Sequence, residues 1–276
     1  MDPPFRKNIP VSLEKAREAD LLWMINLHVA PMSTPLWAGW NSSNFSDTSI
    51  VHKVWYLPQI NQSPNTTSVV TETMNRAQRI AHECNKKYIA VTYDLAIAKV
   101  AMKIQATEMA KYDNILINLG AFHVKMAFLK VLGKFIDESG GPYILNECSV
   151  LQKGSTKVFL SGTHYNRGKR IHQLLAVTME ILHFRAFVSQ CPNEYLNNTL
   201  KHEVARTIVD APHMLTDTSN EMREILNSYR EFTEHTRNGT HGQTAQYWMG
   251  YIDMVHLYHE FSRSIRTGDL QLYIHC

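Results

Sequence analysis

The chain has 276 residues, of which 44% are hydrophobic and 19% are charged. This composition is globular, and ten prolines and twelve glycines are too few for a disordered or fibrous protein. The formal net charge of +3, from 28 basic and 25 acidic residues, does not by itself indicate nucleic-acid binding.

Four widely separated cysteines argue against a zinc finger and against the disulfide framework of a small secreted domain. The first twenty residues contain no apolar core of a signal peptide. The apolar segment 21–30 is shorter than the ~20 residues that span a bilayer. We therefore expect an intracellular protein, nuclear or cytoplasmic, without membrane contact. The cysteines are Cys84, Cys148, Cys191 and Cys276.

Residues 1–66 are expected to form an N-terminal arm. The run LLWMINLHV at 21–29 predicts a strand, because prolines bound it. The segment 37–65 is rich in Ser, Asn, Pro and Trp and predicts an irregular path over the surface. Its aromatic side chains are expected to pack against the core rather than to stack on a ligand. They are Trp37, Trp40, Trp55 and Tyr56.

Helical and strand patterns alternate over residues 67–160, which predicts an α/β core. Alternation at this spacing is typical of βαβ units, so the strands are expected to pair in parallel. The predicted elements are helix 67–86, strand 88–93, helix 94–109, strand 114–119, helix 123–137, a short helix or strand at 143–150, and a turn and strand at 155–160.

Residues 161–276 predict a mostly helical region, without an internal repeat. The chain then closes with a turn at Gly268-Asp269 and an apolar segment that runs to Cys276. Because this segment is regular rather than polar, we expect a C-terminally truncated copy of a longer protein. The predicted helices are 165–188, 194–210, 219–236 and 243–265.

Asp94 follows the first predicted strand of the core and begins a helix. A carboxylate at the carboxyl end of a parallel strand lies where α/β proteins bind ligands and metals. An Asp in that position is also an ordinary N-cap residue. His123 follows the next strand, so the two side chains are expected at one sheet edge. There they could orient a general base or help to hold a metal, or His123 could satisfy a backbone carbonyl.

The densest basic stretch of the chain is HYNRGKR at 164–170, which precedes a long helix. It indicates a surface that could meet a phosphate backbone, although short basic turns are more often plain solvated surface. If it binds nucleic acid, other cations should gather beside it. The candidate contacts are His164, Tyr165, Arg167, Lys169 and Arg170, with Lys153, Lys157, Arg263 and Arg266 as the expected neighbours.

His256 and His259, with Asp253, share one face of a predicted helix. The aromatic residues around them favour packing over a metal site. The chain contains no G-x-S-x-G, Walker loop or G-x-G-x-x-G motif. Hydrolase, kinase and dinucleotide-dependent functions therefore find no support.

Five long stretches resemble a large family of transposon-derived animal proteins whose core is expected to be ribonuclease-H-like. The resemblance extends over almost the whole chain from about residue 21. The resemblance implies an α/β fold with a partly parallel sheet and flanking helices, followed by a mostly helical half. The stretches are WYLPQINQSP (55–64), IAVTYDLAIAKVAMKIQ (89–105), YDNILINLGAFHVKMAFLKVLGKFIDESGGPYIL (112–145), GTHYNRGKRIHQLL (162–175) and YIDMVHLYHEFSRSIRTGDLQLYIHC (251–276).

The same resemblance implies that Asp94 matches the first catalytic carboxylate of such enzymes, with His123 beside it. More distant transposase-like relatives often carry Asp where this chain has Ala121. The resemblance also implies that family members are longer and carry a Glu, a plausible third carboxylate, in a region after the segment that ends this chain at Cys276. Two-metal phosphoryl transfer needs several clustered carboxylates, and no spacing supports a substitute from Glu138, Glu147 or Asp253.

We therefore expect a catalytically inactive protein with residual, weak DNA binding and no cofactor. One alternative is an active Mg²⁺-dependent nuclease or transposase. Another is a protein-interaction module on the helical half. Its expected apolar surface consists of Tyr247, Trp248, Tyr251, Leu257 and 270–274.

Overall fold

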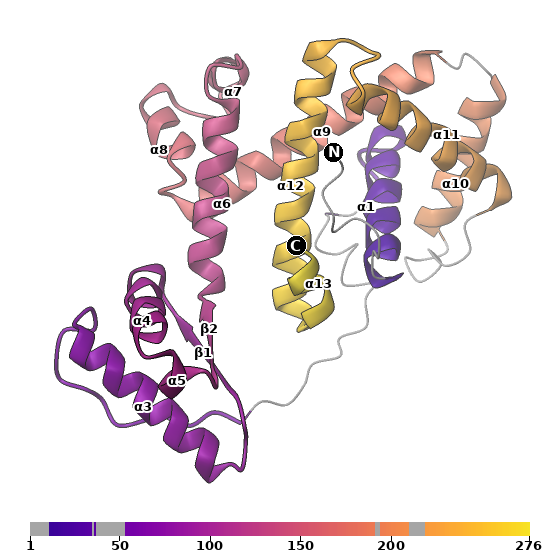
Figure 1. The fold of residues 1–276 in the computed structure, drawn as a ribbon. Helices are drawn as coiled ribbons and strands as arrows, with labels where there is room; N and C mark the ends of the chain where they lie inside the picture. The colour runs from indigo at the N-terminus through magenta and orange to yellow at the C-terminus, as the bar shows by residue number, and fades with distance from the viewer. Residues whose placement is uncertain (1–10, 35, 37–52, 191–193, 210–218) are drawn as a thin grey trace. The chain divides into compact units, whose positions relative to one another are not determined.

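The computed structural model describes residues 11–34, 36, 53–190, 194–209 and 219–276. The chain divides into two compact units, Ile50–Phe128 and a larger one that joins Met1–Ser49 to Leu129–Cys276. The boundary between them falls within helix α6 (Ala121–Ile136). Figure 1 shows the elements of both units.

The smaller unit is built on a pair of parallel strands, as predicted. Tyr93 at the end of the first strand lies opposite Leu119 at the end of the second, and the Gly120 N–H donates to the Tyr93 carbonyl at 2.7 Å. The helix and strand bounds predicted here are confirmed to within a few residues. The elements are α3 (Thr67–Glu83), β1 (Ile89–Tyr93), α4 (Leu95–Thr107), α5 (Met109–Tyr112), β2 (Ile115–Leu119) and the start of α6.

One face of the two-stranded sheet packs against α3 and α4, and the other face is exposed. Tyr93 and Ile115 are buried in the covered face, together with Met74 of α3 and Ala101 of α4. Strand side chains alternate between the two faces, so Leu116 of β2 is 56% exposed. The unit is therefore a two-layer βαβ arrangement with one open sheet face.

The predicted ribonuclease-H-like sheet is wrong. Within the described residues β1 and β2 are the only strands, and helices form most of the rest. The run 21–29 lies inside helix α1 (Val11–Val29), where five consecutive residues from Leu22 to Asn26 are buried. A short apolar run buried on all sides looks the same in a helix and in a strand, so this run was wrongly predicted as a strand.

Two further predictions fail. Residues 155–160, predicted as a turn and strand, lie at the end of η1 (Lys153–Ser155) and in α8 (Thr156–Leu160). Trp55 and Tyr56 do not pack on a core, since they are 77% and 96% exposed. Trp37 and Trp40 lie outside the described residues.

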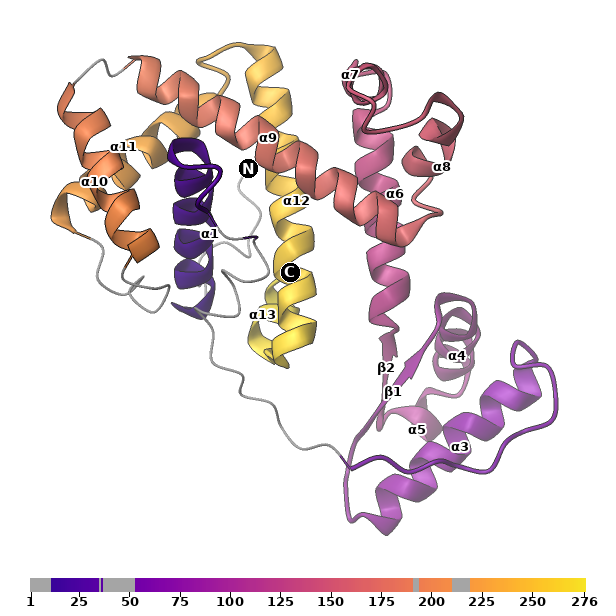
Figure 2. The same ribbon diagram turned by 180° about the vertical axis from the view of Figure 1, so that it is seen from behind.

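Within its described residues, the larger unit consists of helices joined by turns and loops, with no strand. Helix α9 is its longest element, and Figure 2 shows it running past α8, α12 and α1 toward α11. The four long helices predicted over 165–265 are confirmed, and the segment 143–150 is mainly helix. The remaining elements are α7 (Gly141–Glu147), α9 (Tyr165–Gln190), α10 (Glu194–Val209), α11 (Asn220–Arg237), α12 (Gln243–Thr267) and α13 (Leu270–His275).

Helix α11 illustrates how the sequence forms this unit. Ser219 caps it by accepting a hydrogen bond from the Met222 N–H at 3.1 Å. Met222, Ile225, Leu226 and Tyr229 recur at helical spacing and are all buried. They meet aromatic side chains of α9, where the rings of Phe184 and Tyr229 pack edge to face, 5.1 Å apart.

Two ion pairs join α1 to α12 across 243 residues of sequence. Arg17 donates two hydrogen bonds to Glu260, at 2.6 and 3.0 Å, and the Glu260 side chain is only 4% exposed. Arg263 donates to both carboxylate oxygens of Asp20, at 2.8 and 3.1 Å. The Arg17–Glu260 pair is bidentate, which fixes orientation as well as distance, whereas Arg263 uses a single nitrogen for both Asp20 oxygens.

The buried imidazoles of His172 and His183 are neutral in the folded chain. His172 Nδ1 lies 2.8 Å from the Tyr251 hydroxyl, and burial lowers the pKa of His172 to about 4. His183 lies between the hydroxyls of Tyr229 and Thr236, at 2.9 and 2.8 Å, and burial likewise lowers its pKa to about 4. Both groups must therefore acquire a proton when the chain unfolds in mild acid.

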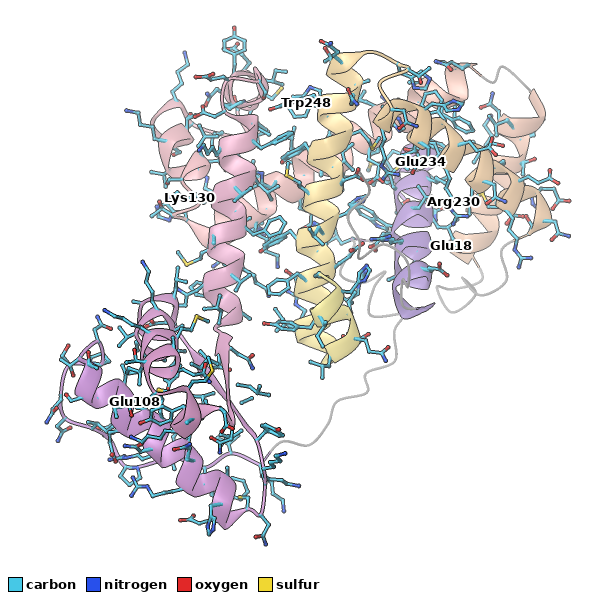
Figure 3. The ribbon with its side chains drawn as sticks, viewed as in Figure 1. Glu18, Glu108, Lys130, Arg230, Glu234 and Trp248 are labelled. Atoms are coloured by element: carbon cyan, nitrogen blue, oxygen red, sulfur yellow. The ribbon has the colours of Figure 1, made fainter. Side chains whose placement is uncertain are left out.

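The Arg17→Ala substitution is expected to lower the free energy of unfolding by on the order of 2 to 3 kcal/mol, because it leaves the buried Glu260 carboxylate unpaired. Arg230→Ala is the matched control. Arg230 of α11 lies 3.8 Å from Glu18 of α1 (Figure 3), but this pair is much more exposed than the Glu260 pair, with Arg230 at 53% and Glu18 at 34%, so its loss should cost less than about 0.5 kcal/mol. Urea unfolding of both variants measures the difference. Equal costs would show that the Glu260 pair does not hold α12.

Stability is expected to fall as the pH drops from 6.5 toward 4. The pKa values of His172 and His183 are lowered on folding, so the stability they contribute is complete above their unfolded value of 6.5 and is lost toward pH 4. Each contributes on the order of 3 kcal/mol over that window. Thermal unfolding of His172→Gln, which keeps a partner for Tyr251, should depend less steeply on pH. An unchanged pH profile would contradict this.

Candidate functional site

Asp94 acts as a helix cap. Its carboxylate accepts a hydrogen bond from the Ile97 N–H at 2.8 Å, and its own backbone is extended, as an N-cap residue requires. The carboxylate also lies at the positive end of the α4 dipole. The structural interpretation of Asp94 therefore accounts for its position without a ligand.

His123 lies in the first turn of α6 and is exposed. Its backbone N–H donates to the Gly120 carbonyl at 2.9 Å, and its ring packs edge-on against Phe122. The strands that precede Asp94 and His123 end at one sheet edge, as predicted, since Tyr93 lies opposite Leu119. No hydrogen bond joins Asp94 to His123 in this part of the chain.

The described residues contain no group of three or more His, Cys, Asp or Glu side chains that could hold a metal ion. Asp253, one of the substitutes considered above, is paired with Arg237 at 2.5 and 2.9 Å. Burial opposes the charged form of His256, but the Glu180 carboxylate 3.4 Å away outweighs it and raises the pKa of His256 to about 9. These side chains are thus committed to pairs between helices.

The basic stretch forms the first turns of α9. Arg167 and Arg170 are exposed there, and so is His164 just before the helix. The Tyr165 side chain contacts α12, where the Tyr258 hydroxyl donates to the Tyr165 hydroxyl at 3.1 Å. The Arg167 guanidinium donates to the Ser155 hydroxyl at 3.3 Å, which ties the start of α9 to η1.

A hollow of about 90 Å³ opens beside this contact. Its walls come from η1, α8 and the start of α9, and no carboxylate lines it. The sequence analysis did not predict it, because Ser155, Val158 and Phe159 lie in the segment 155–160 that was expected to be a turn and strand. The lining residues are Gly154, Ser155, Val158, Phe159, His164, Arg167 and Gly168.

Two glycines allow the close packing that positions α8. A Cβ atom at Gly133 of α6 would lie 2.1 Å from the Leu160 carbonyl oxygen, so only glycine fits there. Gly162, just after α8, has a φ of 68° and would also meet the α6 backbone if it carried a side chain. The wall of the hollow is therefore fixed against α6.

Cations from α12 join the basic stretch of α9. Burial and the nearby Arg266 lower the pKa of Lys169. Burial, together with the surrounding cations, Lys169 and Arg266 among them, lowers the pKa of His259 to about 3. The predicted neighbour Arg266 is thus beside Lys169, whereas Arg263 is paired with Asp20.

The apolar surface expected on the helical half is largely packed. Tyr251 and Leu272 are buried, and the ring of Tyr247 stacks on Phe135 of α6 at 4.6 Å. Within the proposed patch, Leu270 and Ile274 are exposed, at 68% and 73%. The contact of α12 with α6 thus occupies the aromatic side chains that were expected to meet a partner.

Comparison with known proteins gives one family. Residues 36–276 match the model of a family described as a domain of unknown function, DUF8702. The chain belongs to this family. No curated protein and no solved structure matches it. Among the described residues, no helix is both long enough and apolar enough to cross a membrane.

If Asp94 is a cap and not a metal ligand, Asp94→Ala should lower the free energy of unfolding by about 1 kcal/mol, and Asp94→Ser should retain most of that stability. Asp113→Ala, at an exposed Asp with no capping bond, is the control. Mg²⁺ and Mn²⁺ should leave the melting temperature of all these proteins unchanged. A metal-induced rise in the native chain that both Asp94 variants lose would contradict the assignment.

Proposed function

We propose that this chain binds nucleic acid through a basic surface on the larger unit and has no metal-dependent nuclease activity. We assign to it basic side chains from four elements. They are Lys153 in η1, Lys157 in α8, His164, Arg167, Lys169 and Arg170 at the start of α9, and Arg266 near the end of α12.

The observation that carries this proposal is the group of exposed basic side chains at the start of α9, His164, Arg167 and Arg170, with Arg266 of α12 close enough to affect Lys169. Two like charges repel, and the lowered pKa of Lys169 reports burial together with that repulsion. Within the described residues neither side chain has an acidic partner. A phosphate backbone would supply the missing negative charge and would release its condensed counterions on binding.

The assignment of Asp94 to the cap of α4 supports the absence of catalysis. Two-metal phosphoryl transfer requires a cluster of carboxylates, and the described residues provide none around Asp94. A binding function without cleavage is also compatible with the proposed descent from a transposon. A nuclear or cytoplasmic location belongs to the same proposal, because nucleic acids are found there.

The test is the salt dependence of binding by the full chain. The logarithm of the affinity for a fluorescent DNA duplex should fall linearly with the logarithm of the salt concentration, with a slope of about −0.9 per phosphate contact. The double variant Lys169→Ala with Arg266→Ala should bind more weakly, and its slope should be shallower by the amount that about two phosphate contacts contribute. Its melting temperature should not fall, because the substitution removes a repulsion.

Lys201→Ala with Arg223→Ala is the matched control. It removes the same net charge from exposed positions on α10 and α11, and the affinity and slope should stay near the native values. Equal losses in both double variants would mean that net charge alone governs binding. Undetectable binding by the native chain at low salt would contradict the proposed function.

A further inference from the structure

We propose that the hollow beside Arg167 holds the terminal phosphate of a nucleic-acid strand. This inference rests on the proposed function and names the chemical group that the site recognises. The surface of Lys169 and Arg266 would follow the backbone, whereas the hollow would hold an end.

The size of the hollow selects a small ligand. Its volume of about 90 Å³ admits several water molecules. Pockets that enclose drug-sized ligands are larger, with roughly 300 Å³ or more. The hollow is therefore of a size to hold a phosphate group rather than to enclose a nucleobase with its sugar.

The lining supplies donors and positive charge with no opposing carboxylate. The only hydrogen bond of the Arg167 side chain to the described residues goes to Ser155, at 3.3 Å. Its remaining N–H groups are available to an anion. The exposed imidazole of His164 makes no side-chain hydrogen bond in the same part of the chain and adds a further donor.

The Ser155 hydroxyl is also available. Ser155 stands in the N-cap position of α8, but its side chain makes no capping bond. Because its oxygen accepts from Arg167, its own proton can be donated to a ligand in the hollow. Apolar contact from Val158 and Phe159 closes the remaining wall.

Three side-chain donors suit a phosphate monoester better than an internal phosphodiester. A monoester has three acceptor oxygens and a charge of about −1.5 to −2 at neutral pH. A diester has two unbridged oxygens and one charge. Because it continues into the strand on both sides, two chain segments would have to pass through the opening of a hollow of this size. The end of a strand has one such link.

The experiment compares oligonucleotides of one sequence with a 5′-phosphate, a 3′-phosphate or hydroxyl groups at both ends. The native chain should bind at least one phosphorylated form about tenfold more tightly than the hydroxyl form. Arg167→Ala should abolish that preference. Arg170→Ala, at an exposed neighbour that does not line the hollow, should weaken all three forms and keep the preference.

Equal affinity for all three forms, or a preference that survives Arg167→Ala, would overturn the inference and leave the proposed function standing. A phosphopeptide that binds through Arg167 as tightly as the phosphorylated oligonucleotide would overturn the assignment to a strand end.

Inorganic phosphate tests the hollow without nucleic acid. In NMR spectra of the full chain it should shift the amide signals of Gly154 and Gly168, and Arg167→Ala should prevent the shift. Unmoved signals at millimolar phosphate would overturn the inference even if DNA binds. Shifted signals without any DNA binding would reject the proposed function and, with it, the strand end as the ligand.

Discussion

Helix α12 packs on α9 and α11 and is also joined to α1 by two ion pairs. Glu260 is almost fully enclosed, and taking a carboxylate out of water costs several kcal/mol unless a cation compensates it. Arg17 provides that compensation from a helix 243 residues earlier in the chain. Asp20 and Arg263 repeat the arrangement one turn away with the charges reversed. A buried charge tolerates few alternative partners, so these pairs specify one seating of α12.

That seating determines where the positive charge gathers. Arg263 lies one turn before Arg266, and its pairing with Asp20 fixes the end of α12. Arg266 is then held beside Lys169 of α9, without a carboxylate between them in the described part of the chain. Arg17 and Arg263 are paired with carboxylates on another helix, whereas Lys169 and Arg266 have no such partner within the described residues. This difference is the reason why the candidate surface is placed around Lys169 and Arg266.

Sequence patterns over a few residues predicted the features of the fold that depend on neighbouring residues. The strand–helix–strand order around Asp94, the parallel pairing and the long helices follow from periodicity and capping. The number of strands does not, since the run buried in α1 looks the same in either conformation. Ambiguity also remained at Asp94, because a cap and a metal ligand use the same residue in the same position. The hollow depends on tertiary contacts of Gly133 and Ser155 that no sequence pattern marks.

Binding of an anionic polymer to Lys169 and Arg266 should change how Lys169 titrates. NMR titration of the Lys169 amino group measures this. In the free chain the pKa of Lys169 should lie below the ordinary 10.5, rise in Arg266→Ala and rise on addition of a DNA duplex. A pKa that is the same in the native chain and in Arg266→Ala, and that DNA does not change, would rule out this role for Lys169.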